Sequence, residues 1–314
     1  MIKLQDLRAA VRGKIVLNEN LASYSSFKIG GNADFFVRPC DKDDVVSAVA
    51  FFHQANMPYI ILGRGSNILI SDEGVRGAVI SLRENLEHVV IEGERVYAEA
   101  GADLPALAMQ TLKQGLGGLE NLSGIPGSLG GAILMNAGAY GKEIFEVIEW
   151  VEVVRDGKIM RLHKSEIRYT YRDTDLQNDV ILATEMRLKK LTPHEQKAAM
   201  QRRKEWMDKR RATQPLNLPN AGSIFKNPPH DETGKPRYAG ALIEACGLKG
   251  ARHGNAQISE KHANFIVNLG GAKASDVLAL IRLAQCAVKD KFGIGLELEI
   301  KLIGFEVKKE GVML

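Results

Sequence analysis

The stretch Gly115-Leu-Gly-Gly-Leu-Glu-Asn-Leu-Ser-Gly-Ile-Pro-Gly-Ser-Leu-Gly-Gly-Ala-Ile-Leu-Met-Asn-Ala-Gly-Ala-Tyr-Gly141 holds nine glycines in twenty-seven residues, with Glu120 as its only formally charged side chain. Because glycine has no Cβ, its backbone adopts positive φ and approaches a ligand closely, so N–H groups can be aimed at an anion. Apolar residues such as Leu119, Ile133 and Met135 need burial, which is not typical of a flexible linker. The stretch therefore predicts an ordered loop that binds phosphate through backbone amides.

A second glycine turn lies nearer the N-terminus, at Gly63-Arg64-Gly65-Ser66-Asn67. It follows a short apolar strand expected at 59–62 and leads into another. Before it, an extended segment at 34–38 precedes an amphipathic helix at 41–54. Residues 1–84 therefore predict a first lobe of βαβ type.

The middle of the chain is expected to be mostly β. Two strands flank Gly93-Glu94, and further strands are expected at 150–154 and 180–187. Between them, Asp103 has the side chain of a helix N-cap. Residues 85–212 therefore predict a second lobe.

A capping box at Thr192-Pro193-His194-Glu195 opens a charged helix that runs to about residue 211 and is expected to connect two lobes. Residues 213–300 then form a third lobe. Its expected elements are helices at 239–245 and 276–291 and strands at 264–268 and 296–303. Since 314 residues exceed what one hydrophobic core usually serves, we expect an α+β fold with three lobes.

Bulk properties exclude several classes of protein. The 42 basic and 38 acidic residues give a formal net charge of +4, and no long basic run suggests a nucleic-acid partner. No apolar stretch approaches the roughly 20 residues of a membrane helix, and the start of the chain lacks an apolar leader, so a cytoplasmic protein is expected. Three cysteines without C-x-x-C spacing argue against a disulfide framework and a zinc site, and we expect no metal.

Several common signatures are missing from the sequence. There is no G-x-G-x-x-G, G-x-x-x-x-G-K-[ST], H-E-x-x-H or G-x-S-x-G pattern. Gly63-Arg64-Gly65 lacks the third glycine of a Rossmann site. If both glycine loops bind phosphate, they converge on a pyrophosphate through another architecture.

These motifs resemble one family in their order along the chain. The matching segments are Ser26-Phe-Lys-Ile-Gly-Gly-Asn-Ala33, Leu62-Gly-Arg-Gly-Ser-Asn-Ile-Leu69, Gly118-Leu-Glu-Asn-Leu-Ser-Gly-Ile-Pro-Gly-Ser128, Asn136-Ala-Gly-Ala-Tyr-Gly141, Tyr171-Arg-Asp173, Asn220-Ala-Gly-Ser-Ile-Phe-Lys-Asn-Pro228 and Leu296-Glu-Leu-Glu-Ile300. The chain resembles the UDP-N-acetylenolpyruvoylglucosamine reductase (MurB) family from about residue 26 to 304. A set of ordered motifs is far more specific than any single glycine loop.

The resemblance implies a fold and a reaction. The fold is a two-lobed FAD-binding module of the PCMH or vanillyl-alcohol-oxidase type, spanning about 29–195 with its first lobe completed by 301–314, plus an α+β substrate-binding domain. The reaction is the NADPH-dependent reduction of UDP-N-acetylglucosamine-enolpyruvate to UDP-N-acetylmuramate through FAD, in peptidoglycan synthesis and hence cell-wall biogenesis, cell shape and cell division. FAD is then the cofactor and NADPH the hydride-donating cosubstrate.

The resemblance also points to three catalytic residues: Arg172, Ser223 and Glu299. Without it, an arginine beside Asp173 is more often part of a surface ion pair, and a serine after a glycine is usually a turn residue. Strand alternation would leave both Glu297 and Glu299 on one face, so periodicity alone does not choose between them. The family pattern favours Glu299.

Further site residues are carried over from the resemblance. Those expected to bind the cofactor are Gly63, Arg64, Gly65, Ser66, Asn67, Asn121, Ser123, Gly124, Ile125, Pro126, Gly127, Ser128, Gly131, Asn136, Gly138, Ala139, Tyr140, Gly141 and Arg211. Those expected to bind the substrate are Tyr171, Lys226, Asn227, Gln257, His262 and Asn264. His262 reads equally well as a structural histidine, and Arg211 as a solvated helix end.

Two other readings stay open on the sequence alone. One is another FAD-dependent oxidoreductase of the same architecture that acts on a sugar or a hydroxy acid, and the other is a non-catalytic nucleotide-sugar binding protein. The region before residue 220 has no room for the tyrosine-bearing insertion of some members, which indicates the shorter subtype. The sequence leaves the oligomeric state open, with a monomer expected.

Overall fold

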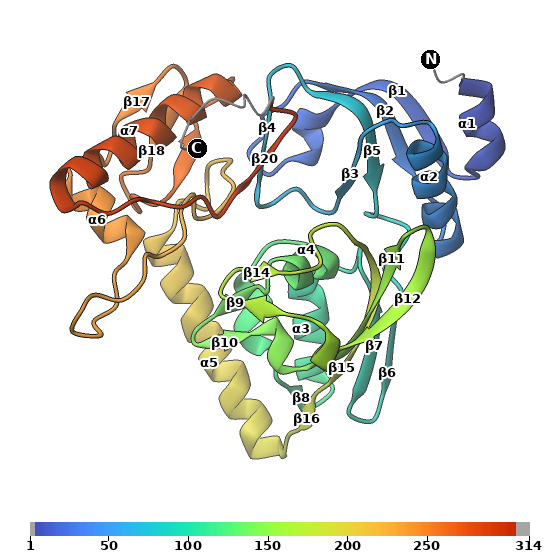
Figure 1. Cartoon of the computed structure of the whole chain (residues 1–314). Helices are drawn as coiled ribbons and strands as arrows, with labels where there is room; N and C mark the ends of the chain where they lie inside the picture. Colours follow the sequence, from blue (N-terminus) through green and yellow to red (C-terminus); the bar gives the residue numbers. More distant parts are fainter. Residues whose placement is uncertain (1–3, 306–314) are drawn as a thin grey trace. The chain divides into compact units, whose positions relative to one another are not determined.

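The computed structural model describes residues 4–305 (Figure 1). The chain folds into two compact units. Unit 1 comprises Met1–Asn18, Asp34–Arg64 and Gly77–Lys209, and unit 2 comprises Glu19–Ala33, Gly65–Arg76 and Arg210–Leu314. The three lobes expected from the sequence divide the chain elsewhere, at residues 84 and 212, and stay a prediction. Of the segment expected to complete the first lobe, residues 306–314 lie outside the described part of the chain.

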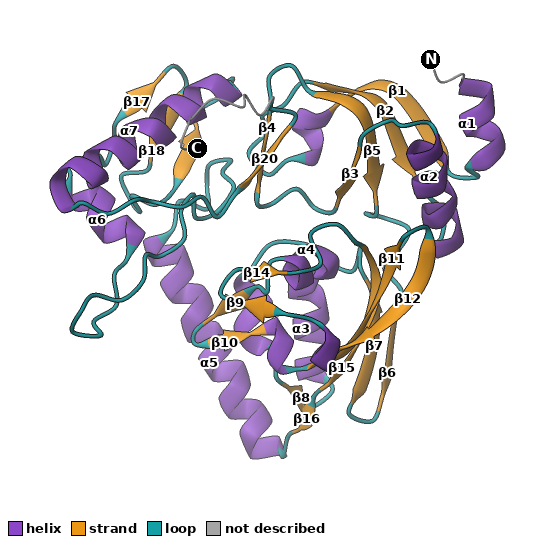
Figure 2. Cartoon of the chain, viewed as in Figure 1, coloured by secondary structure: helices purple, strands orange, loops and turns teal. Residues whose placement is uncertain are grey.

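Unit 1 contains a five-stranded antiparallel sheet of order β12-β11-β15-β7-β6 (Figure 2). Its strands are β6 (Val89–Glu92), β7 (Arg95–Glu99), β11 (Ile148–Arg155), β12 (Lys158–His163) and β15 (Val180–Arg187). The strands expected around Gly93-Glu94, at 150–154 and at 180–187 are confirmed. Asp156 and Gly157 form the two-residue turn between β11 and β12 with φ values of 50° and 72°, as such hairpins require.

The glycine-rich stretch is ordered, as expected. It runs through β8 (Leu116–Gly117), η2 (Glu120–Gly124), α4 (Leu129–Leu134) and β9 (Gly138–Ala139). α4 packs against β15 and β7, and it comes so close that a Cβ on Gly130 would lie 2.9 Å from the Cβ of Ala100. Some glycines of this stretch therefore serve close packing of helix on sheet.

Helix α3 (Leu104–Lys113) begins where the sequence predicts it. The Asp103 side chain accepts a hydrogen bond from the Ala106 amide at 2.7 Å, which caps the helix. The remaining elements that lie in unit 1 or begin there are α1 (Leu4–Ala10), β1 (Lys14–Asn20), α2 (Lys42–Gln54), β3 (Tyr59–Leu62), β10 (Lys142–Glu143), η3 (Ile144–Glu146), η4 (Lys164–Glu166), β13 (Tyr169–Thr170), β14 (Asp173–Thr174), β16 (Lys189–Lys190) and α5 (Pro193–Thr213). β2 (Asn32–Arg38) and β5 (Val75–Ser81) complete a sheet of order β1-β2-β5-β3, in which β3 and β5 run parallel.

The capping box of α5 is also confirmed. The Glu195 amide donates to Thr192 Oγ1 at 3.2 Å, and the Thr192 amide donates to Glu195 Oε2 at 2.8 Å. The Lys189 ammonium, 2.8 Å from the carboxylate, together with these bonds lowers the pKa of Glu195 to about 2. The Glu195 carboxyl is therefore ionised at neutral pH, where it caps the start of α5.

Unit 2 has a core of its own, in which Phe27 and Leu69 from early segments pack with Ile224, Ile266 and Ile281. Its elements are η1 (Leu21–Tyr24), β4 (Ile68–Ile70), α6 (Ala239–Ala245), β17 (Arg252–His253), β18 (Ala256–Ile258), β19 (Ile266–Asn268), α7 (Ala274–Phe292) and β20 (Lys301–Ile303). β17, β18 and β19 form an antiparallel sheet, and β4 pairs with β20 in parallel.

Two strands are shorter than the sequence suggests. The strand expected at 296–303 is regular only at Lys301–Ile303, and the one expected at 264–268 only at Ile266–Asn268. The reason in the first case is a change of partner, because the main chain at 297–299 bonds to residues 224–226 before β20 joins β4. Glu297 and Glu299 therefore lie before the regular strand, and strand alternation does not place them on one face.

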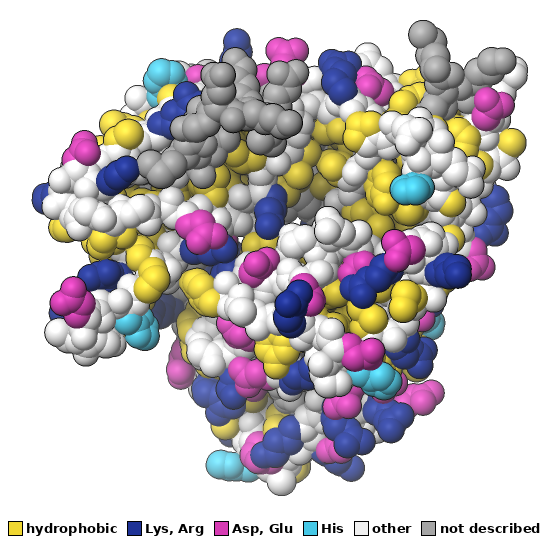
Figure 3. All heavy atoms as spheres, viewed as in Figure 1, with side chains coloured by type: hydrophobic (Ala, Val, Ile, Leu, Met, Phe, Trp, Pro, Cys, Tyr) yellow, Lys and Arg dark blue, Asp and Glu magenta, His cyan; other side chains and the backbone are white. Residues whose placement is uncertain are grey.

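The surface carries charges of both signs. On the face shown in Figure 3, the Lys and Arg side chains lie among Asp and Glu side chains. Within residues 4–305, no helix combines the length and the apolar character that a membrane span requires.

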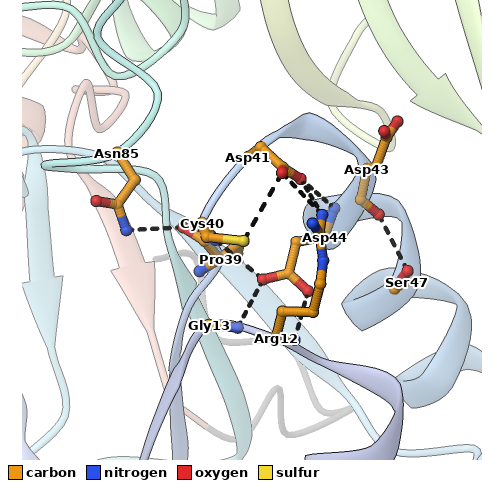
Figure 4. A network of polar contacts seen from close by, with 9 residues as sticks. All are labelled: Arg12, Gly13, Pro39, Cys40, Asp41, Asp43, Asp44, Ser47 and Asn85. Carbon is orange, nitrogen blue, oxygen red and sulfur yellow. Dashed lines mark hydrogen bonds and ion pairs between the residues drawn. The ribbon is translucent and has the colours of Figure 1, made fainter.

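Asp44 ties the start of α2 to the segment before β1 in unit 1 (Figure 4). Its side chain is 1 % exposed and accepts three backbone N–H groups, from Arg12 and Gly13 at 2.8 Å and from Cys40 at 2.9 Å. Each is a charge-assisted hydrogen bond to a carboxylate. A single side chain thus satisfies donors from two segments.

We expect Asp44→Ala to lower the free energy of unfolding by about 2–4 kcal/mol, because it leaves three donors without their acceptor. Asp43→Ala, one residue earlier and exposed, is the matched control and should cost less than about 1 kcal/mol. Urea unfolding of both variants measures the difference. Equal costs for the two substitutions would contradict the role given to Asp44.

Candidate active site

Arg172 lies in the two-residue turn of the β13–β14 hairpin of unit 1. Tyr169 pairs with Thr174 and Thr170 with Asp173, which leaves Tyr171 and Arg172 as the turn. Arg172 has a φ of 59°, a conformation that residues other than glycine and asparagine rarely adopt. Its Nη2 donates to the Gly138 carbonyl at 2.6 Å, and its guanidinium lies 4.8 Å from the centre of the Tyr171 ring.

Asn136 is fully buried and lies beside this turn. Its Nδ2 donates to Glu143 Oε2 at 2.7 Å and to the Thr170 carbonyl at 2.9 Å. Both partners are acceptors, so the orientation of the amide is fixed by chemistry. Its Oδ1 is buried and has no hydrogen-bond partner among residues 4–305. A buried acceptor of this kind requires a donor.

The two glycine loops meet within unit 1. A Cβ on Gly63 would lie 2.1 Å from Ser128 Oγ, so residue 63 has no room for a side chain while Ser128 keeps this position. Ser128 caps α4 by accepting from the Gly131 amide at 3.4 Å. Next to Gly63, Arg64 forms ion pairs with Asp103 at 3.1 Å and Glu87 at 3.2 Å. Gly63 and Ser128 thus bring the two loops into contact, and their convergence on a pyrophosphate stays a prediction.

Within the glycine-rich stretch, side chains and amides are largely used by the chain itself. Asn121 is 4 % exposed and its Nδ2 donates to the Ala139 carbonyl at 2.9 Å, while Ser123 Oγ donates to the Glu120 carbonyl at 2.7 Å. The amides of Ile125, Leu129 and Gly130 donate to chain carbonyls. These groups hold the loop in shape, so the amides that we expect to meet a ligand lie elsewhere in it.

Tyr140, Gly141 and Asn136 show why this stretch is irregular. All three have positive φ, at 54°, 77° and 39°. The Tyr140 ring stacks on Trp206 of α5, with centroids 4.6 Å apart, and its hydroxyl donates to the Trp206 carbonyl at 3.1 Å. The contact with Trp206 was not foreseen, since nothing in the sequence relates residues 66 positions apart.

The serine loop belongs to unit 2 and is shaped by amide side chains. Asn220 Oδ1 accepts from the Gly222 amide at 2.9 Å, and Gly222 has a φ of 77°. Asn264, 4 % exposed, accepts from the Phe225 amide at 3.0 Å and donates to the Phe225 carbonyl at 2.8 Å. Half-buried Ser223 lies between these anchors.

The acidic segment runs beside the serine loop. The Glu299 amide donates to the Ile224 carbonyl at 2.8 Å, and the Lys226 amide donates to the Glu297 carbonyl at 2.9 Å. Asn67 Nδ2 donates to the Glu299 carbonyl at 3.0 Å. The structure therefore brings Ser223 and Glu299 onto adjoining segments of unit 2, whereas Arg172 belongs to unit 1 and its meeting with them stays a prediction.

The two glutamates differ in their surroundings. Glu297 has a side chain that is 74 % exposed and forms an ion pair with Lys226 at 2.6 Å. Glu299 is half-buried and its main chain is bonded on both sides. The burial of Glu299 and the ion pair of Glu297 both favour Glu299 as the carboxyl that faces a reacting group.

Most residues expected to bind substrate have structural contacts in unit 2. Asn227 Oδ1 accepts from the Ala239 amide at the start of α6 at 3.1 Å, and Gln257, 7 % exposed, donates to the Gly250 carbonyl at 3.1 Å. Asn264 has both ends of its amide occupied by Phe225. Tyr171, also expected to bind the substrate, is exposed in unit 1. Among the residues expected to bind the cofactor, Arg211 is exposed, and Gly65 and Ser66 lie in the turn before β4. The binding roles of these residues stay predictions.

Gly65 has a clear reason to be glycine. It has a φ of 62°, and a Cβ there would lie 2.1 Å from the Tyr24 carbonyl oxygen. Its carbonyl accepts from the Ser26 amide at 3.0 Å. The turn from Gly65 to Asn67 is thus held in unit 2 by main-chain hydrogen bonds and by the Asn67 side chain.

His262 is packed as a structural side chain. Its ring lies edge-on to Phe265 with centroids 4.9 Å apart, and its Nδ1 accepts from the Asn264 amide at 3.2 Å. A Cβ on Gly240 would lie 2.9 Å from its Cε1. Burial, followed by the charge of Lys249, lowers the pKa of His262 below its ordinary value of 6.5.

This lowered pKa makes stability depend on pH. Below pH 6.5 the unfolded chain binds a proton at His262 that the folded chain resists, so the free energy of unfolding should fall as the pH falls through and below that value. In His262→Gln this part of the decline should vanish, whereas His163→Gln, at an exposed histidine, should retain it. Urea unfolding at pH values of about 7.5 and 5.5 measures the difference, and an unchanged decline in His262→Gln would contradict it.

Two family profiles match separate parts of the chain. Residues 33–163 match the family profile described as an FAD binding domain, and residues 214–303 match that of the C-terminal domain of UDP-N-acetylenolpyruvoylglucosamine reductase. An FAD-binding module joined to a second α+β unit defines the class: the chain is an FAD-containing oxidoreductase, and the expected fold class is confirmed.

Relatives of known name narrow the class. The chain is 59 % identical over 305 residues to a UDP-N-acetylenolpyruvoylglucosamine reductase of Chloroherpeton thalassium, covering 97 % of this chain and 98 % of the relative. A relative of that name from Desulforamulus reducens is 42 % identical, with 95 % and 97 % covered. The crystal structure of UDP-N-acetylenolpyruvylglucosamine reductase (MurB) from Thermus caldophilus superposes with a TM-score of 0.77 at 35 % identity, over 93 % of this chain and 99 % of that one. The chain belongs to the UDP-N-acetylenolpyruvoylglucosamine reductase family.

The residues of unit 1 fit the cofactor of this family. FAD carries hydroxyl and ring N–H donors, and the buried Asn136 Oδ1 is an acceptor that the described chain leaves unpaired. Gly63 and Ser128 bring the two glycine loops into contact, and a side chain at residue 63 would clash with Ser128. Both observations are consistent with a bound flavin nucleotide.

Proposed function

We propose that this protein reduces the enolpyruvyl group of UDP-N-acetylglucosamine-enolpyruvate with NADPH, through FAD, to give UDP-N-acetylmuramate for peptidoglycan synthesis in the cytoplasm. The observation that carries the proposal is the pairing of the serine loop with the acidic segment, which puts a hydroxyl and a carboxyl on neighbouring segments of chain. An oxidase of the same architecture has no use for such a proton donor. Roles in cell shape and cell division follow from the pathway.

Each of the three proposed catalytic residues has its own role in the reaction. A bound flavin that NADPH has reduced would supply the hydride for the terminal carbon of the enolpyruvyl double bond. Negative charge then develops on the neighbouring carbon and in the carboxylate of the substrate. The Arg172 guanidinium pairs with that carboxylate, and Glu299 in its protonated form donates a hydrogen bond to it. Ser223 then gives its proton to the neighbouring carbon as the general acid.

Lys226 is our choice for a contact to the substrate diphosphate. Its side chain is 20 % exposed and its ammonium already meets Glu297 at 2.6 Å, so the substrate phosphate would replace or share that partner. Tyr171, beside Arg172, and Asn227, beside Lys226, are proposed to line the same site.

An anaerobic titration tests the proposal. The purified protein should be yellow, NADPH should bleach it, and addition of the enolpyruvyl sugar without oxygen should restore the colour. A protein that is bleached by NADPH but not reoxidised by the sugar is another flavin enzyme. A colourless protein that binds the sugar is a nucleotide-sugar binding protein.

A further inference from the structure

The turn that carries Arg172 needs support from outside the hairpin. Two residue pairs connect β13 and β14, and Arg172 has a left-handed φ of 59°, which is unfavourable for an L-residue. Such a conformation persists only where surrounding contacts determine it.

Three hydrogen bonds come from one segment, residues 134–138. Asn136 Nδ2 donates to the Thr170 carbonyl at 2.9 Å, directly before the turn. The Gly138 carbonyl accepts from Arg172 Nη2 at 2.6 Å, and the Leu134 carbonyl accepts from Thr174 Oγ1 at 2.8 Å. Asn136 is the only side chain of the segment among these three contacts, so the segment's side-chain support depends on it.

Glu143 in turn holds Asn136. Its Oε2 accepts from Asn136 Nδ2 at 2.7 Å, and in the β9–β10 ribbon Glu143 is paired with Gly138, whose carbonyl holds Arg172. A Cβ on Gly138 would lie 2.9 Å from Glu143 Cγ and 3.2 Å from Arg172 Nη1. Glu143 and the guanidinium therefore pack against the same glycine.

We propose that Glu143, acting through Asn136, is a positioning residue for Arg172. The proposal rests on the proposed function, because it is the reductase reaction that requires Arg172 to meet a substrate carboxylate. Without the Glu143 carboxylate, one N–H of a fully buried amide loses its acceptor, and the bond that keeps the Asn136 amide oriented toward Thr170 is lost. The turn then loses a contact that keeps Arg172 in its left-handed conformation.

The effect should appear in one half of the reaction. A misplacement of about 1 Å can cost on the order of 10²-fold in rate. We therefore expect Glu143→Ala to slow reoxidation of the reduced flavin by the enolpyruvyl sugar by about 10–100-fold, with reduction by NADPH changed less than about two-fold. Glu143→Gln keeps an acceptor oxygen for Asn136 and should recover most of the lost rate.

Glu146→Ala is the matched control. Glu146 Oε1 accepts from the Glu143 amide at 3.0 Å and Oε2 pairs with Lys142 at 2.8 Å, so this variant disturbs the same short ribbon without removing the bond to Asn136. Both half-reactions should stay near those of the unmodified protein. Glu143→Val, which suits a strand but has no acceptor, replaces the alanine variant should that one not retain FAD.

A double-mutant cycle separates positioning from general destabilisation. In an Arg172→Lys background, Glu143→Ala should slow reoxidation by less than about two-fold further, because the guanidinium that it positions is gone. The inference is overturned if Glu143→Ala reoxidises at the normal rate, slows both half-reactions equally, or has its full effect in that background. If the unmodified protein is not reoxidised by the sugar at all, it is the proposed function that fails.

Discussion

Replacing Ser223 with alanine is expected to slow reoxidation of the reduced flavin by the enolpyruvyl sugar by about 10²–10⁴-fold, the usual size of general acid catalysis. Reduction of the flavin by NADPH should remain nearly intact, since no proton is delivered to carbon in that half-reaction. Anaerobic stopped-flow measurement of the two half-reactions compares them directly.

The loop should survive this substitution. It is held by Asn220 on one side of Ser223 and by Asn264 on the other, and neither anchor uses the Ser223 hydroxyl. Ser275→Ala, at an exposed serine of α7, is the control for loss of a hydroxyl in the same unit. Equal slowing of both half-reactions by Ser223→Ala would defeat the assignment of Ser223 as the general acid.

Replacing Glu299 with glutamine should reduce the same step by about 10²–10³-fold, whereas Glu297→Gln should leave it near normal. Loss of one donor to a developing oxyanion has this size, and an amide N–H is a far weaker acid than a carboxyl group. Glu297 is mostly exposed and paired with Lys226, so its replacement should affect KM at most. Single-turnover rates and steady-state KM values for both variants provide the measurement, and the opposite ranking would mean that Glu297 is the catalytic carboxyl.

Local structure was predictable where single residues determine it. The caps at Asp103 and Thr192, the Asp156-Gly157 turn and helix α6 follow from side-chain chemistry or periodicity that acts within a few residues. The strand expected at 296–303 was too long, because apolar alternation does not reveal that the chain changes partner from Ile224 to β4 within that span. Which segment a strand pairs with depends on tertiary contacts, which local sequence patterns do not reveal.

The candidate site was predictable only in part for the same reason. The density of glycines predicts the irregular backbone of the glycine-rich stretch, whereas the contact between Gly63 and Ser128 is found only in the structure. The contacts of Asn264, which shape the serine loop through both ends of its amide, were not foreseen, and its expected place at the substrate stays a prediction. Glu143 was missed, because its importance depends on the β13–β14 hairpin, which is remote from it in sequence and is linked to it through Asn136.

The segments of the two units alternate along the sequence, which affects how the chain folds during synthesis. The core of unit 2 combines Phe27 and Leu69 with residues that follow position 210, so the early segments leave the ribosome long before their partners exist. The apolar side chains of these segments therefore stay unburied during synthesis, when chaperones can bind them and incorrect contacts can form. No single cut in the chain releases either half intact, and attempts to express the C-terminal portion alone should yield an incomplete core.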